Sequence, residues 1–321
     1  MIELQTVWGW QPALYLFFGG LGAGTFLISA LVHIATKKHG KLVAAGMWSA
    51  VACLVIGLVL LITEVTGPFK AILMWRSFSN LPSSWMAIGC WLLFAGLVFF
   101  FVSACAMTPL FRKILRIQDG TANKVATACA AIGMLLAIGI AAYTGILLEA
   151  APGVPFWSTN YLPLLFTISA IDTGVALTML IALATEPEPH GMVIKLEVAS
   201  FVLILAEIAA LILFITYMLG GGNQFMDTLE VGYSATATAS AQSWLTGQLA
   251  VPFWALLVAI GLAVPLALDM YAMFGKNPRG RKAPTIVGAL CVLVGGCTLR
   301  FITVLAGTHV DVISNTVAAL L

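Results

Sequence analysis

Charged residues are scarce in this sequence. Asp, Glu, Lys and Arg make up 9% of its 321 residues, whereas hydrophobic residues make up 61%, and the mean hydropathy is +1.05. An ordinary soluble domain carries about a quarter charged residues. The composition therefore excludes a water-soluble fold, and the net charge of +2 gives no indication of nucleic-acid binding.

The sequence also lacks the ligand patterns of resident metals and haem. Its six cysteines lie in apolar runs and never form a C-x-x-C pair, so they are predicted to be small buried side chains and not iron–sulfur or zinc ligands. Of the four histidines, only His33 lies within an apolar run, which argues against a haem held by two histidines on facing helices. We expect no haem, no iron–sulfur cluster and no metal site in this protein. The cysteines are Cys53, Cys90, Cys105, Cys129, Cys291 and Cys297.

Long apolar runs dominate what is there. A membrane-spanning helix needs about 20 mostly apolar residues. The N-terminus has neither the basic region nor the cleavage site of a secretory signal, so its first run is expected to remain as a helix. We predict an all-α integral membrane protein with eight transmembrane helices in one membrane domain, 1–321, built as two four-helix bundles, 1–149 and 150–321. The eight runs are 12–36, 42–63, 86–108, 125–148, 162–185, 197–219, 250–273 and 285–306.

Lysine and arginine gather in alternate loops. Twelve of the fifteen follow spans 1, 3, 5 and 7, and cytoplasmic loops are the ones that carry such an excess. Both termini are therefore predicted to face outward, on the periplasmic side of a bacterial inner membrane, and the clean alternation supports an even number of spans. Tryptophans near the predicted outer ends indicate an aromatic belt; they are Trp8, Trp10, Trp75, Trp85, Trp157 and Trp244.

Three charged residues fall deep within predicted spans, namely Asp172, Glu207 and Arg300. A charge inside the bilayer costs several kcal/mol unless it faces protein or water, which makes each a functional candidate. They are predicted to form either a proton path or an ion pair that holds helices together. Since no ring or row of like charges is evident, a pore is disfavoured.

Glycines cluster in span 1 as GGLGAG, 19–24. In a lipid-embedded helix such small residues usually form a close-packing surface, here either within the bundle or across a dimer. The scattered carboxylates and the four-plus-four arrangement also permit a secondary transporter. The paired Gly/Pro interruptions expected of one are weak, because only span 7 has Pro252 and Pro265.

Several segments resemble the NrfD-type membrane subunits, the quinone-reactive anchors of polysulfide reductase and related respiratory molybdoenzymes. The likeness extends over nearly the whole sequence and depends on the order and spacing of the segments together. They are YLFFGGLGAGTFL (15–27), EVTGPFKAILMWRSFSNLPSSWMAIGCWLL (64–93), YTGILLEAAPGVPFWSTNYLPLLFTISAIDTGVAL (143–177), FWALLVAIGLAVPLAL (253–268) and VGGCTLRFITVLAG (294–307).

The resemblance implies a haem-free, eight-helix membrane anchor that exchanges electrons between menaquinone or another membrane quinone and an iron–sulfur subunit on its outer face. That partner would be a four-cluster ferredoxin-like protein, with a molybdopterin catalytic subunit beyond it. A quinone pocket needs hydrogen-bond partners and a titratable group. The candidates are Gln11, Tyr15, Glu64, Tyr143 and Glu149.

Two alternatives stay open at this point. Tyr15 and Tyr143 lie where interfacial belt tyrosines are common, so either could face lipid and not a quinone. The protein could also serve as an anchor without quinone chemistry. The second alternative is disfavoured because one or two helices would suffice and because Asp172, Glu207 and Arg300 would then have no purpose.

Overall fold

The computed structural model describes residues 8–36, 40–64, 84–114, 116, 118–151, 153–186, 190–223, 232–274 and 282–308. Within these ranges eight helices are long and apolar enough to cross a membrane, and every regular element is helical. The predicted all-α, eight-span membrane fold is therefore confirmed. The elements are α1 (Trp10–Thr36), α2 (Gly40–Glu64), α3 (Trp85–Met107), α4 (Pro109–Ile114), α5 (Asp119–Glu149), α6 (Tyr161–Thr185), α7 (His190–Leu219), α9 (Tyr233–Leu245), η2 (Pro252–Ala263), α10 (Val264–Phe274) and α11 (Lys282–Leu305).

The helices differ from the predicted runs mainly at their polar ends. Helix α5 starts at Asp119 and α7 at His190, six and seven residues before the apolar runs begin, because polar residues continue each helix beyond the apolar segment. The predicted loop after span 6 contains a further helix, α9. Its sequence YSATATASAQSWL is short and rich in Ser and Thr, so it lacks the long apolar run that identified the spans.

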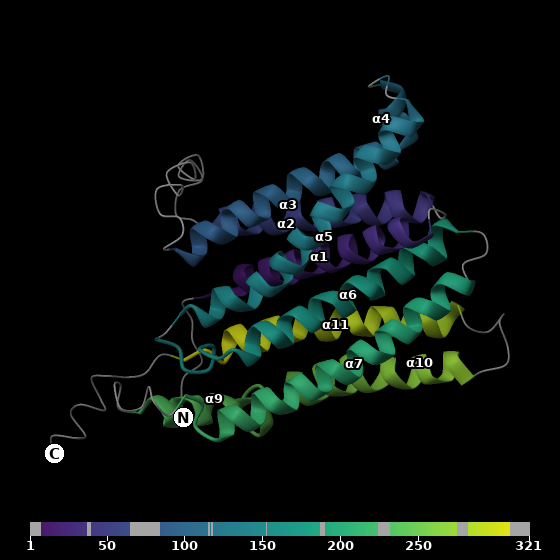
Figure 1. Ribbon diagram of the computed structural model, residues 1–321. Coiled ribbons are helices and arrows are strands. Elements are labelled where there is room, and N and C mark those ends of the chain that lie inside the picture. The colour runs from purple at the N-terminus through teal and green to yellow at the C-terminus, as the bar shows by residue number, and fades with distance from the viewer. Residues whose placement is uncertain are drawn as a thin grey trace, which may run out of the picture.

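The spans lie roughly antiparallel, with α1 near the middle of the assembly (Figure 1). Helix α1 packs against α2 and α5 of the first half and against α6 and α11 of the second. We call the helix ends that carry Lys41, Arg112, Lys124, Lys195 and Lys282 the basic end, and the opposite end, with Trp8, Trp85 and Trp157, the tryptophan end.

Glycines bring α1 and α6 into backbone contact. A Cβ on Gly24 would meet the carbonyl oxygen of Ala170, and one on Gly174 would meet the backbone of Gly24. On another side of α1, a Cβ on Gly22 would come within 3.0 Å of the Ala50 oxygen in α2. The GGLGAG segment therefore packs inside the bundle, as close approach of membrane helices through small residues requires.

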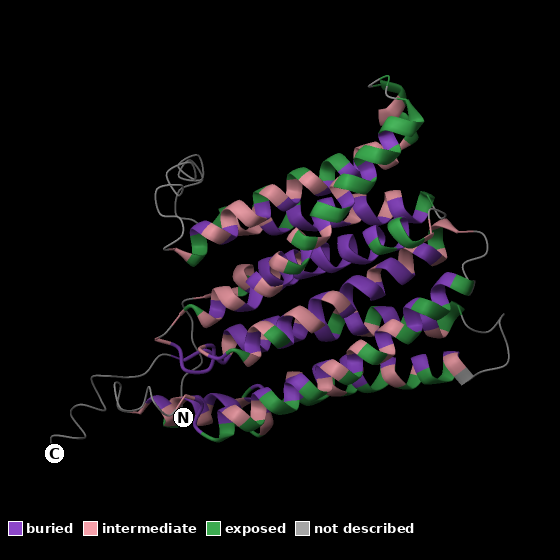
Figure 2. Ribbon diagram, viewed as in Figure 1, coloured by how far each residue is buried: buried purple, intermediate pink, exposed green. Residues whose placement is uncertain are grey.

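Burial follows this arrangement (Figure 2). Helix α1 is buried along most of its length, with 83% of its most apolar stretch inside the protein, whereas α3, α5, α7 and the span made by η2 and α10 reach only 33%. Away from their polar ends, the exposed side chains of those outer helices are mostly apolar, for example Leu135 at 73% and Val202 at 57%. Such surfaces suit contact with lipid tails, whereas in water exposed apolar patches of this extent promote aggregation.

Span 7 contains a stretch of π-helix, η2, before continuing as α10. Pro265 has no N–H to donate to the carbonyl of Gly261, which removes one α-helical bond at the junction. The Val264 N–H instead donates to the Ala259 carbonyl, five residues back. Gly261 also lies against Gly295 of α11 with no room for a Cβ on either residue.

The aromatic-belt prediction is wrong for two tryptophans. Trp157 and Trp244 are 2% and 0% exposed and lie in the core. Their indole N–H groups donate to the carbonyls of Thr303 at 2.8 Å and Ile302 at 3.1 Å. These carbonyls belong to the last turn of α11. The two bonds give each buried indole N–H the acceptor that it needs. Trp10 and Trp85, at 56% and 50%, remain exposed as predicted, and Trp75 lies outside the described residues.

Candidate functional site

A pocket of about 320 Å³ opens at the tryptophan end between α1, α2, α3 and α5. Its volume is at the lower end of the range for small-molecule sites. Apolar side chains form nearly all of its wall, and the two phenols of Tyr15 and Tyr143 are its main polar groups. The lining residues are Trp8, Pro12, Tyr15, Leu16, Leu61, Met86, Cys90, Leu93, Tyr143 and Leu147.

Tyr15 and Tyr143 come from helices far apart in the sequence. Tyr15 lies one turn and a half into α1, and Tyr143 lies near the end of α5, where the antiparallel packing brings it alongside. The two hydroxyl groups are close neighbours, and Cys90 is near both. At 3% and 4% exposure they are not lipid-facing belt tyrosines. They instead present paired hydroxyl groups to an apolar pocket.

Gly89 makes the position of Tyr143 possible. A Cβ built on Gly89 would overlap the phenol ring and hydroxyl of Tyr143. Gly89 lies in the first turn and a half of α3, whose start is capped by the Ser84 hydroxyl accepting from the Ala87 N–H at 3.4 Å. The missing side chain therefore leaves room for the hydroxyl end of the Tyr143 ring against α3.

The other sequence candidates lie near the pocket but not in its wall. Gln11 is half-buried one turn before Tyr15, and Glu149 is half-buried at the end of α5. Neither belongs to the lining. Glu64 is the last residue of α2, and its side chain lies outside the described part of the protein. The structure thus brings together Tyr15 and Tyr143, and leaves Gln11 and Glu149 at the rim of that region.

Arg300 lies in the centre of the second half with no exposed surface. Its Nη1 donates to the Ser169 hydroxyl at 2.5 Å and to the Gly296 carbonyl at 3.0 Å, and its Nη2 donates to the Phe166 carbonyl at 3.1 Å. The guanidinium carbon also lies 4.9 Å from the centre of the Phe166 ring, which is cation–π distance. Among the described residues no carboxylate comes within 4.0 Å of it.

Ser169 accepts from Arg300 and is a polar neighbour of Glu207, and the charges of Arg300 and Glu207 also interact electrostatically. Glu207 is 4% exposed and Asp172 is 1% exposed, and the two carboxylates are electrostatic neighbours. The three predicted residues therefore belong to one buried polar group in α6, α7 and α11. A direct ion pair was one of the two predicted roles, and among the described residues none is recorded between Arg300 and a carboxylate within 4.0 Å.

Two further buried carboxylates extend this group toward the basic end. The Ser200 hydroxyl donates to Asp172 at 3.0 Å and also contacts Asp269. Beyond Asp269, the Thr285 hydroxyl donates to Glu197 at 2.6 Å. Sequence reasoning missed Glu197 because it is the first residue of the predicted run 197–219, at the polar boundary of a span, whereas α7 starts at His190 and places Glu197 two turns inside the helix. We call Arg300, Glu207, Asp172, Asp269 and Glu197 with their serine and threonine partners the acid chain.

Helix α1 separates the pocket from the acid chain. The Nη2 of Arg300 lies 3.4 Å from where a Cβ of Gly20 would be. Gly20 follows Tyr15 by five residues, which is about 7.5 Å along a helix axis. The acid chain therefore begins about one and a half turns deeper than the pocket, on the opposite side of α1.

Comparison with known proteins decides the family. The family model described as "Polysulphide reductase, NrfD" matches residues 3–311. The protein belongs to the NrfD family. The C component of polysulfide reductase from Wolinella succinogenes is 33% identical over 94% of the length of both proteins. Protein NrfD of Escherichia coli is 25% identical, over 94% of this protein and 95% of the relative.

A more distant relative is the C component of selenate reductase from Mesobacillus selenatarsenatis, which is 25% identical over 54% of this protein and 47% of its own length. The predicted resemblance to the NrfD family is thereby confirmed. The protein is therefore a multi-pass membrane protein of a family whose members include components of reductases. The described residues of this family member hold no group of three His, Cys, Asp or Glu side chains that could bind a metal ion.

Proposed function

We propose that this protein is the membrane anchor and quinone-binding subunit of a multisubunit respiratory oxidoreductase. The observation that carries the proposal is the apolar pocket with the Tyr15 and Tyr143 hydroxyls at its wall. A quinone has an apolar ring with two carbonyl oxygens, and a phenol O–H is a suitable donor to such an oxygen. When bound, the quinone supplies a carrier of two electrons and two protons.

The residues present fit that ligand. The hydroxyls of Tyr15 and Tyr143 are close neighbours, so one hydroxyl can turn toward a carbonyl while the other supports it. Leu61, Leu93 and Leu147 exclude water from the ring faces. The glutamate at the end of α5, Glu149, lies half-buried less than two turns from Tyr143 and is our proposed proton exchanger with the solvent.

Family membership supports our choice of partners. We propose that an iron–sulfur subunit of the four-cluster ferredoxin type docks on the tryptophan end, next to the pocket, and that a molybdopterin catalytic subunit lies beyond it. Two of the relatives are named as single components of larger reductases, which supports an assembly with further subunits. We further propose that the basic end faces the cytoplasm of a bacterium, since Lys and Arg favour that side.

The test is gentle purification of the complex in native lipid nanodiscs, with mass spectrometry of its proteins and organic extraction of its quinone. We expect an iron–sulfur subunit and bound quinone with the wild-type protein. Tyr143→Phe removes one hydrogen bond, worth up to about 1.5 kcal/mol, and should weaken quinone binding by roughly tenfold.

Tyr161→Phe is the matched control. Tyr161 lies at the same end of the bundle, packs on Tyr217 at 5.2 Å and is not part of the pocket wall, so quinone content should not change. A protein that purifies alone and quinone-free from nanodiscs would contradict the proposal, and transport assays would then test the secondary-transporter alternative.

We also propose that the acid chain moves protons between the basic end and the middle of the membrane. Its members are buried, and three hydrogen-bonded pairs, Arg300–Ser169, Ser200–Asp172 and Thr285–Glu197, lie along it. Electrostatic proximity of Glu207 to Asp172 and of Asp269 to Glu197 connects these pairs. Burying a carboxylate within a membrane costs free energy, and carboxylates that are nevertheless found there are typical of proton relays. An inert core would be served better by apolar residues of the same size.

Asp172→Asn tests the proton path. The amide still accepts from Ser200 but cannot take up a proton, so we expect proton uptake from the basic side to fall at least tenfold while quinone stays bound. The complex is reconstituted in liposomes, reduced methyl viologen supplies electrons to the partner subunits, a soluble quinone accepts them, and a pH-sensitive dye reports protons. The control is Asp119→Asn, whose carboxylate is 87% exposed beside Arg112. Equal proton uptake in both variants would contradict the proposal.

A further inference from the structure

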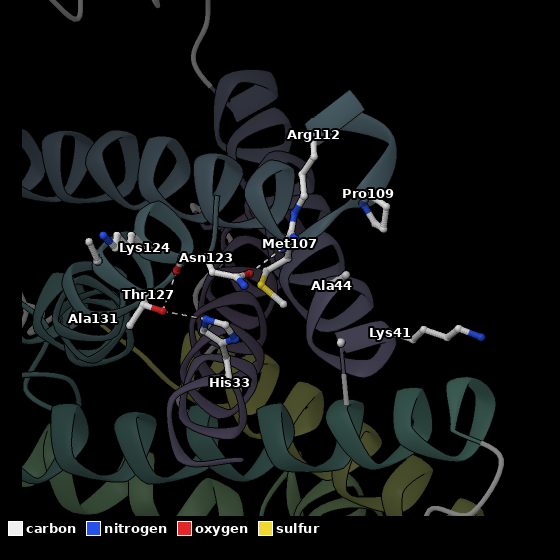
Figure 3. Close-up of a pocket in the computed structure, with 12 residues that line it drawn as sticks. His33, Lys41, Ala44, Met107, Pro109, Arg112, Asn123, Lys124, Thr127 and Ala131 are labelled. Atoms are coloured by element: carbon white, nitrogen blue, oxygen red, sulfur yellow. Dashed lines mark hydrogen bonds between the residues drawn. The ribbon is translucent and has the colours of Figure 1, made fainter. Parts of the chain in front are cut away.

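A second and larger cavity, of about 1150 Å³, opens at the basic end of the first half. It lies between the end of α1, the start of α2, helix α4 and the start of α5 (Figure 3). Nothing in the proposed quinone chemistry uses it, because it lies at the opposite end of the bundle from Tyr15 and Tyr143. We call it the basic pocket.

Positive charge surrounds the basic pocket. Its lining includes Lys41, Arg112 and Lys124, together with His33. Figure 3 shows the two lysines on opposite rims, with Arg112 and His33 between them. Within the described part of the protein the one recorded carboxylate partner is Asp119, 3.3 Å from Arg112. The lysines are exposed, so their charges remain available to a ligand.

Polar side chains that are joined by hydrogen bonds line the middle of the basic pocket. The Arg112 Nε donates to the Ala106 carbonyl at 2.6 Å, and its Nη2 donates to the Asn123 side chain at 3.0 Å. Opposite them, His33 Nε2 and Thr127 Oγ1 are 3.2 Å apart. Gly40 and Lys41, the first turn of α2, also line the pocket, and the first N–H groups of a helix lack partners within it and favour an anion.

The lining also contains apolar side chains. Ala44 and Met107 are half-buried, and Ala128 and Ala131 are exposed on α5. From Ala131 the surface continues along α5 onto the exposed side chains of Ile132 and Leu135, at 45% and 73%. A ligand that matches the whole pocket therefore has an anionic head and a long apolar tail.

We infer that the basic pocket binds an anionic phospholipid of the leaflet at the basic end, with the phosphate between Lys41 and Lys124 and an acyl tail along α5. Basic pockets between membrane helices on the cytoplasmic side suit such headgroups. A soluble phosphate compound would use the same cations but would leave the apolar wall of Met107, Ala128 and Ala131 in contact with water. The lipid is therefore the better match.

Native mass spectrometry of the complex tests this, after equilibration with equal amounts of phosphatidylglycerol and phosphatidylcholine. We expect the wild type to retain phosphatidylglycerol preferentially. In Lys41→Gln/Lys124→Gln the preference should fall by roughly fivefold for each lysine removed. The variant Lys41→Arg/Lys124→Arg keeps both positive charges and should keep the preference for phosphatidylglycerol. That result would attribute the fall in the glutamine variant to lost charge and not to a lost fold.

The matched control is Lys113→Gln/Lys195→Gln, which removes two exposed basic-end lysines outside the pocket. An equal fall in the control would overturn the proposal, because the effect would then come from net charge alone. In a separate experiment, soluble sn-glycerol 3-phosphate is added as a competitor of the bound lipid. Displacement of phosphatidylglycerol by millimolar sn-glycerol 3-phosphate would also overturn it, in favour of a site for free phosphate compounds.

Discussion

Gly89→Ala is expected to reduce electron transfer from reduced methyl viologen to a soluble quinone by the purified complex at least tenfold. The added Cβ would occupy the space of the Tyr143 ring and hydroxyl, so the ring must turn away from α3 into the pocket. The pocket holds only about 320 Å³, and an aromatic ring displaced into it leaves no room for a quinone. The measurement is the rate at saturating donor, together with the quinone retained per complex.

Gly96→Ala is the control for this prediction. Gly96 lies two turns further along α3, and a Cβ there would crowd the end of the Ile140 side chain on the same neighbour, α5. Crowding of that flexible end costs stability without touching the pocket wall. If both variants lose quinone turnover equally, the effect of Gly89 is on α3–α5 packing and the assignment of the quinone pocket fails.

The largest effect on stability is expected from Gly174→Ala. Its Cβ would meet the backbone of Gly24 and Thr25 in α1, and backbone cannot move aside as a side-chain end can. Overpacking in a core typically costs about 1–3 kcal/mol and occasionally more; with backbone on both sides we expect about 3 kcal/mol. The midpoint of thermal unfolding in detergent, followed by loss of the monodisperse peak, measures it.

Gly191→Ala provides the comparison, because a Cβ at Gly191 meets nothing within 4 Å. The same substitution in helix α7 should leave the midpoint unchanged or raise it, since alanine favours a helix over glycine by about 1 kcal/mol. An unfolding midpoint of Gly174→Ala close to that of Gly191→Ala would show that α1 and α6 separate at little cost and would contradict the packing described above.

Run length was enough to predict the eight spans, because a bilayer imposes the same minimum of apolar residues on each helix. It failed where other forces stabilise a helix. Helix α9 is held by Trp244, whose ring packs on Phe156, Phe214 and Phe253 at 5.1–5.7 Å, and such contacts between distant segments leave no periodic trace in YSATATASAQSWL. Trp244 was misplaced in a lipid belt for the same reason.

The site was predicted in part. Tyr15 and Tyr143 were chosen from the family resemblance together with Gln11, Glu64 and Glu149, and the first two share a pocket wall. Nothing in the sequence pairs Gly89 with Tyr143, since a glycine that admits a ring from another helix looks like any other small residue. Glu197 and Asp269 were left out of the proton path because their burial depends on how α7, α10 and α11 meet.

The central position of α1 has a consequence for biogenesis. Helix α1 is made first and has the lowest mean hydropathy of the eight spans, 1.8, yet it is the one that lipid touches least in the finished protein. Its glycine surface fits α6, which begins only at Tyr161. During synthesis α1 must therefore remain in the membrane without α6 until the second half emerges, and a protein truncated after α5 would leave that surface facing lipid or an insertion chaperone.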